Sequence, residues 1–331
     1  MAEAVTLAAL GETELIRRLE AYAPPGQFND DAALLQEHSD RVLVITSDVL
    51  VEGVHFSDAT MAGGDLGWRA AAANLSDLAA MGCRSVVGLT VALVAPGSTP
   101  WSWVEGVYGG LGQALERYGG QLLGGDCSAG GQRALAITAL GHLGPMGPIR
   151  RGDGRAGDQL VSTGDHGLSR LGLALLLGET SEGSLAGHQC ARAIQAHRRP
   201  MPRFDAVQAL ERSRPPQQSW RVGGTDSSDG LAAAVALLAR GSGCTALLER
   251  GALPIDPALE PLPQADRWCL GGGEDFELVL ALPPAWCEAF LAALPGSAAI
   301  GRLAAGPVGV IWADTGEVLG ADLGYSHFNV D

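Results

Sequence analysis

The sequence contains no lysine. Its 22 basic residues are all arginine, and they face 37 acidic residues, so the formal net charge is −15. The absence of lysine excludes mechanisms that need its amine, such as Schiff-base formation or phosphate binding by a Walker A lysine. The acidic balance argues against nucleic acid or an anionic membrane as the main partner, because both require a basic face. A nucleotide ligand remains compatible with this charge, because a bound metal ion reverses the local sign.

Paired cysteines and long apolar runs are also missing. The six cysteines are widely scattered and form no Cys-x-x-Cys pair, which disfavours a disulfide framework or a zinc site. We therefore expect reduced cysteines in a cytoplasmic protein. No basic segment precedes an apolar run near the first residue, so we expect no signal peptide. The sequence contains no stretch of ~18 apolar residues, so we expect no membrane span.

The composition is that of a folded protein with two domains. The chain has 331 residues, of which 47% are hydrophobic and 18% charged, which is enough apolar mass for more than one core. Residues 144–158 are rich in glycine, proline and charge, as is typical of a domain boundary. We therefore predict an N-terminal domain over 1–148 and a C-terminal domain over 149–331.

Helical and strand patterns alternate in both halves, which predicts the α/β class. Thr13 is placed to cap a first helix, Asp65 an Ala-rich helix that ends at Gly82, and Ser228 a helix that runs to residue 240. Further helices are predicted over 101–118, 168–177, 185–197, 204–212 and 284–294. Strands are predicted over 41–46, 85–94, 134–141, 159–163, 244–249 and 308–313. A further short strand at Leu122-Leu123 runs into Gly124-Gly125 before Asp126.

Aspartates recur in the polar turns at the ends of apolar runs, where folds commonly place binding groups. They are Asp30, Asp31, Asp48, Asp126, Asp226 and Asp229, and Asp77 shares a helix face with Asn74. Any one of them is as readily a helix cap or a solvated surface group, so the prediction rests on the set. Converging carboxylates without histidine or cysteine suit hard cations such as Mg²⁺. Because such a cluster repels ATP, its convergence predicts more than one Mg²⁺.

Glycine-rich turns are frequent, with 47 glycines in the chain. Glycine lets backbone N–H groups approach phosphate closely, as in Gly124-Gly125 before Asp126. No Walker A motif occurs. The closest approach to Gly-x-Gly-x-x-Gly, at Gly110 and Gly112, lacks the third glycine and lies in a helical pattern, which argues against a dinucleotide fold there.

Several segments, in this order along the chain, resemble the thiamine-monophosphate kinase family. Those in the first half are Asn29-Asp-Asp-Ala-Ala-Leu-Leu35, Thr46-Ser-Asp-Val-Leu-Val-Glu-Gly-Val-His-Phe56, Ala73-Asn-Leu-Ser-Asp-Leu-Ala-Ala-Met-Gly82 and Gly124-Gly-Asp126. Those in the second half are Ser228-Asp-Gly-Leu231, Gly272-Gly-Glu-Asp-Phe-Glu-Leu278 and Gly324-Tyr-Ser-His-Phe328. The ordered set is far more specific than any single segment. The sequence departs from the family at Asn29, at Cys127 and in Thr225-Asp226-Ser227.

The resemblance implies a two-domain fold like that of aminoimidazole ribonucleotide synthetase, with the N-terminal sheets forming a homodimer and ATP in a cleft closed by the C-terminal domain. The implied metal ligands are Asp31, Thr46, Ser47, Asp48, Asp77, Asp126, Asp226 and Asp229, with Asp48, Asp126 and Asp226 central to catalysis. The implied nucleotide contacts are Tyr108, Gly125, Arg151 and Ser228. The implied substrate contacts are His55, Glu274 and Tyr325.

The family reaction transfers the ATP γ-phosphoryl group to thiamine monophosphate and gives thiamine diphosphate, assisted by several Mg²⁺ ions. Taken without the resemblance, His55 equally suits a bond to a backbone carbonyl, Glu274 a helix cap and Tyr325 an anchor for the C-terminal segment. Two other functions stay open. One is an aminoimidazole ribonucleotide synthetase-like ligase with the same ATP site, and the other is a non-catalytic nucleotide-binding scaffold. A selenophosphate synthetase fits less well, because no lysine and no early cysteine are present.

Overall fold

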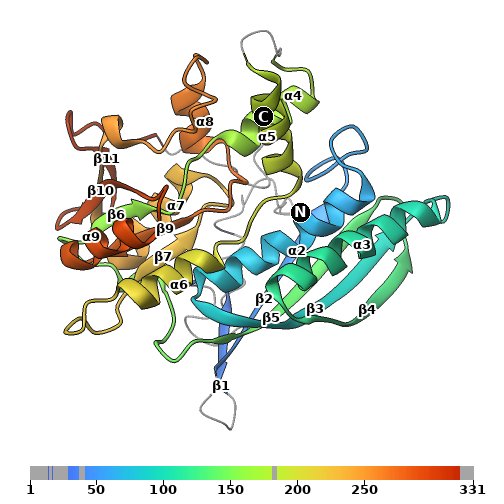
Figure 1. Cartoon of the computed structure of the whole chain (residues 1–331), viewed down its shortest axis with the longest axis horizontal. Coiled ribbons are helices and arrows are strands. Elements are labelled where there is room, and N and C mark those ends of the chain that lie inside the picture. Colours follow the sequence, from blue (N-terminus) through green and yellow to red (C-terminus); the bar gives the residue numbers. More distant parts are fainter. Residues whose placement is uncertain (1–13, 15–16, 18–28, 37–41, 181–184, 321–331) are drawn as a thin grey trace, which may run out of the picture.

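The computed structural model describes residues 14, 17, 29–36, 42–180 and 185–320. These residues form two sheets with helices packed on them, and the two units lie side by side (Figure 1). This arrangement confirms the predicted mixture of helices and strands in both halves. The predicted helix after Thr13 and the closing segment with Tyr325 lie outside the described residues, apart from residues 14 and 17.

The first sheet has five strands in the order β1-β2-β5-β3-β4. They are β1 (Ala33–Gln36), β2 (Val42–Val51), β3 (Cys83–Ala95), β4 (Gln121–Ala129) and β5 (Ala134–Leu143). Neighbouring strands are antiparallel except for β3 and β4, which are parallel. Side chains alternate between the two faces: Leu89, Val91 and Leu93 of β3 are buried in the core, whereas Ala92 is exposed.

Two helices, α2 (Gly63–Ala80) and α3 (Trp101–Tyr118), cover one face of this sheet (Figure 1). They pack closely because glycine lines the contact. A Cβ atom at Gly67 would lie 1.9 Å from the carbonyl oxygen of Val107, and one at Gly110 would lie 2.0 Å from that of Gly64. No described helix covers the other face of the sheet.

The second sheet has six strands in the order β11-β8-β10-β6-β9-β7. They are β6 (Gln159–Ser162), β7 (Gly223–Asp226), β8 (Thr245–Leu248), β9 (Leu278–Leu282), β10 (Ala298–Ala304) and β11 (Gly309–Trp312). Helix α7 (Leu231–Ser242) packs on one face, and α6 (Phe204–Ser213) and α9 (Pro284–Ala293) pack on the other. Because both faces are covered, all five residues of β9 are buried. The short turns η2 (Arg151–Asp153) and η4 (Arg250–Ala252) complete this unit.

Three further helices form a separate cluster beside the second sheet. They are α4 (Leu168–Leu176), α5 (Gly187–Arg198) and α8 (Ala265–Gly271). The carboxyl end of α5 reaches α2 of the first unit, where the indole Nε1 of Trp68 donates to the carbonyl of Pro200 over 2.8 Å and Arg199 pairs with Asp65 at 2.6 Å. Helix α2 therefore contacts both halves of the molecule.

Two helices begin at other residues than the sequence predicted. Helix α2 begins at Gly63, and Asp65 lies in its first turn, where it pairs with Arg199 instead of capping. Helix α7 begins at Leu231, because residues 227–230 form a turn in which Gly230 donates to the carbonyl of Ser227 and adopts φ 107°. The predicted starts at Asp65 and Ser228 were therefore wrong by a few residues.

Two strands continue past their predicted ends. Asp48 and Asp126 were placed in turns after strands, but they lie inside β2 and β4. Pairing with distant strands extends both elements: Asp48 lies opposite Ile137 of β5, and Asp126 lies opposite Ala92 of β3. Pairing with distant strands cannot be predicted from the local sequence, so the predicted ends were too early. Strands β1, β7, β9 and β10 and helix α8 were not predicted. The domain boundary at 148/149 stays a prediction.

None of the described helices is both long enough and apolar enough to cross a membrane. All six cysteines are unpaired, and five of them are buried. The exception is Cys127, which is exposed on β4. The expected absence of a disulfide framework therefore holds.

Candidate active site

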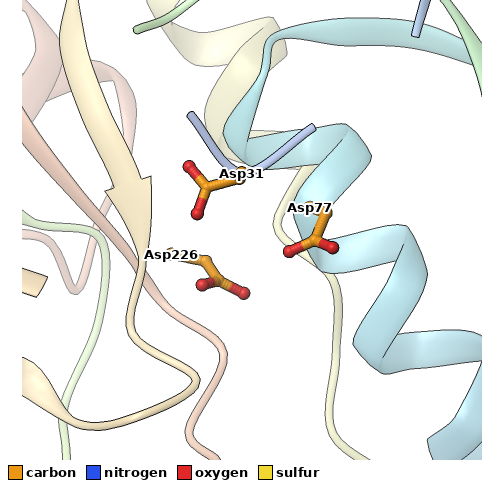
Figure 2. Close-up of side chains that lie close together, drawn as sticks. All are labelled: Asp31, Asp77 and Asp226. Atoms are coloured by element: carbon orange, nitrogen blue, oxygen red, sulfur yellow. The ribbon is translucent and has the colours of Figure 1, made fainter. Parts of the chain in front are cut away.

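Three aspartates from separate parts of the chain point toward one another (Figure 2). Asp31 precedes β1, Asp77 lies in the last turns of α2, and Asp226 ends β7. Each offers a carboxylate oxygen, and these oxygens lie within 4.8 Å of one another. The sequence prediction that these carboxylates meet is therefore confirmed for these three.

Hydroxyl groups hold two of the carboxylates in place. The Thr46 hydroxyl donates to Asp77 Oδ2 over 2.6 Å. The Ser76 hydroxyl donates to Asp226 Oδ2 over 2.6 Å, and the Ser228 hydroxyl donates to Asp226 Oδ1 over 2.9 Å. Ser76 belongs to α2 and Asp226 to the second sheet, so these bonds also join the two domains at the cluster.

Asp31 is held on one oxygen and left open on the other. Its Oδ1 accepts from the Arg151 guanidinium over 2.6 Å and from the Thr225 hydroxyl over 2.8 Å. Its Oδ2 is buried and has no hydrogen-bond partner within the described part of the chain. A buried anionic oxygen without a donor is costly, so this atom is poised for a ligand that supplies positive charge.

The pKa values of the clustered aspartates also indicate a site that favours a bound cation. Burial and the neighbouring carboxylates raise the pKa of Asp77 well above its usual value. Burial also raises the pKa of Asp31 to about 6, against the opposing effect of Arg151. Asp48 behaves similarly, with a pKa of about 6 caused by burial, by Asp229 and by Asp31. Asp48 and Asp229 therefore lie within electrostatic reach of the cluster.

These residues fit a divalent hard cation. The donor set consists of carboxylate and hydroxyl oxygens, which Mg²⁺ prefers, and includes no sulfur or imidazole. A bound cation would satisfy Asp31 Oδ2 and remove the repulsion that raises the pKa values. Asp31, Asp77 and Asp226 would hold it, with Thr46 and Asp48 at the margin.

Two implied metal ligands lie elsewhere. On β2 the side chains of Thr46 and Asp48 face α2, whereas Ser47 points to the opposite face, where its hydroxyl donates to the carbonyl of Ile137 over 2.8 Å. Asp126 lies on β4, which is separated from β2 by β5 and β3. With strands ~4.8 Å apart, this places Asp126 about 14 Å from β2. Within one chain, the structure does not bring Asp126 into the cluster.

Asp126 lies instead with the residues implied in nucleotide binding. Tyr108 of α3, Gly125 and Asp126 line one open pocket together with Leu122, Gly124 and Cys127. Tyr108 is partly buried beside Cys127, and burial, with the nearby thiol, raises the pKa of its hydroxyl. Arg151 and Ser228, the other implied nucleotide contacts, lie at the carboxylate cluster.

The implied substrate contacts His55 and Glu274 lie near each other. The Nδ1 atom of His55 accepts from the backbone N–H of Val51 over 3.0 Å. Glu274 follows α8 and pairs with Arg69 of α2, and it lies near enough to His55 for the histidine to influence its pKa. Tyr325 lies outside the described residues.

Known families and proteins match both halves of the chain. A model described as AIR synthase related protein, N-terminal domain, matches residues 29–143, and its C-terminal counterpart matches residues 155–314. The thiamine-monophosphate kinase of Prochlorococcus marinus is 47% identical over 96% of each chain. That of Synechococcus elongatus is 46% identical over 98% of each chain.

The chain belongs to the thiamine-monophosphate kinase family. The structure of AaThiL complexed with AMPPCP and TMP superposes on it with a TM-score of 0.86, at 29% identity, and covers 98% of this chain and all of that one. The predicted two-domain, aminoimidazole ribonucleotide synthetase-like α/β fold is therefore confirmed. The resemblance found in the sequence is likewise confirmed.

Sequence reasoning missed several residues of this family member's site. Ser76 and Thr225 each donate to a clustered carboxylate, and Arg69 and His197 surround Glu274. A signal was present for one of them. Arg69 is the single charged residue in the run from Leu66 to Ala73, seven positions before Ser76 and so on nearly the same helix face.

The cluster predicts how stability depends on pH and Mg²⁺. Asp31 and Asp48 have folded-state pKa values of about 6, above the usual 3.8. Between about pH 4 and pH 6 the folded chain therefore binds more protons than the unfolded chain. The free energy of unfolding of the metal-free protein should consequently fall as the pH rises through this window. Mg²⁺ should raise Tm by at least ~2 °C at about pH 7.5 and by less at about pH 5.

The measurement is a set of calorimetric melts in EDTA and in Mg²⁺ at both pH values. NaCl at matched ionic strength is the control, because salt screens repulsion without binding specifically. An equal rise in Tm with NaCl would contradict a metal site at the cluster.

Proposed function

We propose that this chain transfers the γ-phosphoryl group of ATP to the phosphate of thiamine monophosphate and so produces thiamine diphosphate. The observation that carries the proposal is the carboxylate cluster built by both domains, in which Asp31 Oδ2 has no hydrogen-bond partner among the described residues. Family membership supports the acceptor, since the related AaThiL is described in complex with AMPPCP and TMP.

The reaction needs no general base. A phosphate monoester has a second pKa near ~6 and is largely dianionic at neutral pH, so its oxygen is already nucleophilic. The obstacle is the repulsion between two anionic phosphates. The site accordingly contains carboxylates that bind cations rather than a catalytic triad.

We propose that the cluster residues bind several Mg²⁺ ions, which neutralise the phosphate oxygens when bound. Asp31, Asp77 and Asp226 hold these ions from fixed positions, and Thr46 and Asp48 complete the set together with Asp229. Arg151 contributes a fixed positive charge beside them, because its guanidinium is anchored on Asp31 and on the Thr225 hydroxyl at 3.2 Å. The contribution of the protein is thus orientation and electrostatics.

The remaining implied residues divide between the two substrates. Tyr108, Gly125 and Ser228 contact the nucleotide, and Tyr108 offers a ring on which adenine stacks. His55 and Glu274 contact the acceptor. A glutamate accepts a hydrogen bond from the amino group of the aminopyrimidine, and Tyr325 offers a ring to the cationic thiazolium.

The test is a chromatographic assay for thiamine diphosphate with purified protein, ATP, Mg²⁺ and thiamine monophosphate. Formation of thiamine diphosphate supports the proposal. Absence of this product, together with ADP release on formylglycinamidine ribonucleotide, would establish the ligase instead. ATP binding without turnover on either acceptor would establish a scaffold.

We also propose that the chain works as a homodimer through the uncovered face of the first sheet. Val49 on this face has 51% of its surface exposed, and every residue of the edge strand β4 is exposed. A second copy would bury this apolar face and protect the free edge. The same packing explains Asp126, since it lies on the uncovered face and far from its own cluster, so it would serve the cluster of the partner.

Mixed dimers test this arrangement. Asp48→Asn and Asp126→Asn should each be almost inactive alone. If Asp126 acts in the site of the other copy, co-expressed variants should recover about a quarter of wild-type activity per chain, because half the dimers are mixed and each has one intact site. Differently tagged chains allow the mixed dimer to be isolated and assayed. No recovery in the isolated mixed dimer would show that Asp126 acts in its own chain.

We further propose a cytoplasmic location. All six cysteines are unpaired, and Cys127 is exposed in the pocket beside Tyr108. Unpaired, accessible thiols suit a reducing compartment.

A further inference from the structure

Arg69 is an unusual residue for the centre of an Ala-rich helix. Its side chain is 2% exposed, and it forms an ion pair with Glu274 of the other domain. The same guanidinium donates to the backbone carbonyl of His197 in α5. The buried Arg69 on α2 therefore contacts two segments of the C-terminal domain, the one with Glu274 and the end of α5.

His197 cannot replace this cation. Its Nδ1 lies 3.6 Å from Glu274 Oε2 and 3.3 Å from the Ser169 hydroxyl, but the ring is 2% exposed. Burial, together with Arg69, lowers the pKa of His197 to about 3, so the ring is uncharged at neutral pH. Arg69 is consequently the residue that balances the charge of Glu274.

The backbone of Glu274 is also held in place by contacts. Glu274 has φ 61°, in the left-handed region that residues other than glycine rarely adopt. Its N–H donates to the carbonyl of Ser228 over 2.7 Å, and a Cβ atom at the preceding Gly273 would lie 2.9 Å from the same oxygen. The Glu274 segment is thus pressed onto the loop that carries Asp226 and Asp229.

Helix α2 connects these features. It bears Arg69 two turns before Asp77, so a single rigid element positions both the Glu274 carboxylate and a member of the metal cluster. The Glu274 side chain keeps 32% of its surface exposed, so it remains accessible to a ligand. A carboxylate with one side buried on an arginine and the other side open is suited to accept an N–H bond in a defined direction.

We propose that Arg69 is a positioning residue for the phosphoryl acceptor: it holds the Glu274 carboxylate in a fixed place beside α2, where that carboxylate accepts a hydrogen bond from the exocyclic amino group of an aminopyrimidine. This inference rests on the proposed function. Arg69 touches neither substrate and acts through Glu274.

The test compares three substitutions. Arg69→Met removes the charge at similar volume, and Arg69→Lys keeps a charge that reaches Glu274. Arg221→Met is the matched control, because Arg221 pairs with another buried carboxylate, that of Asp158, at 2.6 and 2.9 Å in the C-terminal domain. Calorimetric melts of all three variants measure the change in Tm, so that a general loss of stability can be told apart from a change in KM.

Arg69→Met should raise the KM for thiamine monophosphate at least ~10-fold and leave the KM for ATP within about 2-fold, since a charged hydrogen bond to the acceptor is misplaced. Arg69→Lys should restore most of this loss. Arg221→Met should lower Tm without changing either KM. Equal changes in both KM values, or no change in that for thiamine monophosphate, would overturn the proposal.

The pH profile gives an independent readout. Burial raises the pKa of Glu274, but the charge of Arg69 and its hydrogen bond lower it, and the balance lies below the usual value. Without Arg69 the burial remains, so the acidic limb of kcat/KM for thiamine monophosphate should move to higher pH in Arg69→Met. An unshifted limb contradicts the proposal.

A double-mutant cycle covers the case in which Arg69→Met folds poorly. Glu274→Gln removes the charge that Arg69 balances, so the double variant should be more stable than Arg69→Met and no weaker in acceptor binding than Glu274→Gln alone. Additive losses would overturn the proposal.

Calorimetric titration with thiamine monophosphate distinguishes failure of the proposed function from failure of the proposed role of Arg69. If the wild type forms no thiamine diphosphate but binds the acceptor in an Arg69-dependent way, only the proposed function fails, and if it does not bind, both fail.

Discussion

Asp48→Asn should lower kcat by at least ~10²-fold, the scale of losing one element of electrostatic stabilisation. Asp48 lies inside β2, with its backbone N–H donating to Asn74 Oδ1 over 3.1 Å, so the amide variant keeps the strand pairing and the contact with α2. The asparagine oxygen is a weaker ligand for Mg²⁺ than a carboxylate. The loss should therefore fall on turnover rather than on folding.

Stability is the second readout for this variant. Burial, Asp229 and Asp31 raise the pKa of Asp48 to about 6, so at neutral pH its charge is unfavourable in the metal-free fold. Removing that charge should leave Tm unchanged or higher. The matched control is Asp314→Asn, because Asp314 is exposed and pairs with Arg250 at 3.5 Å, in the C-terminal domain. Near-normal turnover of Asp48→Asn would show that Asp48 binds no catalytic metal.

The identity of the clustered residues was accessible from the sequence, but their arrangement was not. Asp31, Asp77 and Asp226 were identified as a set because each stood in a motif of the family and in a chemically suitable pattern. Their convergence depends on pairing between strands far apart in the chain, such as Asp226 opposite Leu278. Such pairing has no local signal, and this also explains why β7, β9 and β10 were not predicted.

The sequence also did not predict on which face of the first sheet Asp48 and Asp126 lie. Asp48 and Asp126 were both placed in turns, where direction is undefined. Once they lie in strands, alternation decides that Asp48 faces α2 and that Asp126, opposite the exposed Ala92, faces away. Asp48 and Asp126 thus lie on opposite faces of the first sheet. This is why the proposed homodimer assigns Asp126 to the site of the second copy.

The departure from the family pattern at Thr225-Asp226-Ser227 has a local explanation. Thr225 donates to Asp31 over 2.8 Å, and the Ser227 hydroxyl lies 3.0 Å from His166 Nε2. Both hydroxyls thus make hydrogen bonds around Asp226. A polar flank at this point is therefore consistent with an intact cluster. The sequence alone could not show this, because Asp31 and His166 are distant in the chain.

Thiamine monophosphate should be phosphorylated with a kcat/KM at least ~10²-fold higher than unphosphorylated thiamine, because the acceptor phosphate provides both the nucleophile and the contacts that align it. Thiamine presents an alcohol, which is neutral at neutral pH and needs a base to become a nucleophile. The described cluster consists of carboxylates, two of which accept hydrogen bonds from hydroxyl groups, and contains no histidine that could act as the base. Thiamine therefore lacks both an attacking anion and a phosphate to place at the cluster.

The measurement is a pair of separate reactions, one with each acceptor, in which chromatography quantifies thiamine diphosphate made from thiamine monophosphate and the total phosphorylated product made from thiamine. In the proposed function Glu274 and His55 contact the rings, which the two acceptors share, so Arg69→Met should weaken both and leave their ratio nearly unchanged. Asp48→Asn should reduce the ratio, because it removes the part of the site that distinguishes a phosphate from an alcohol. If wild-type protein uses both acceptors equally well, the phosphate is not positioned by the cluster, and the carboxylates serve the nucleotide alone.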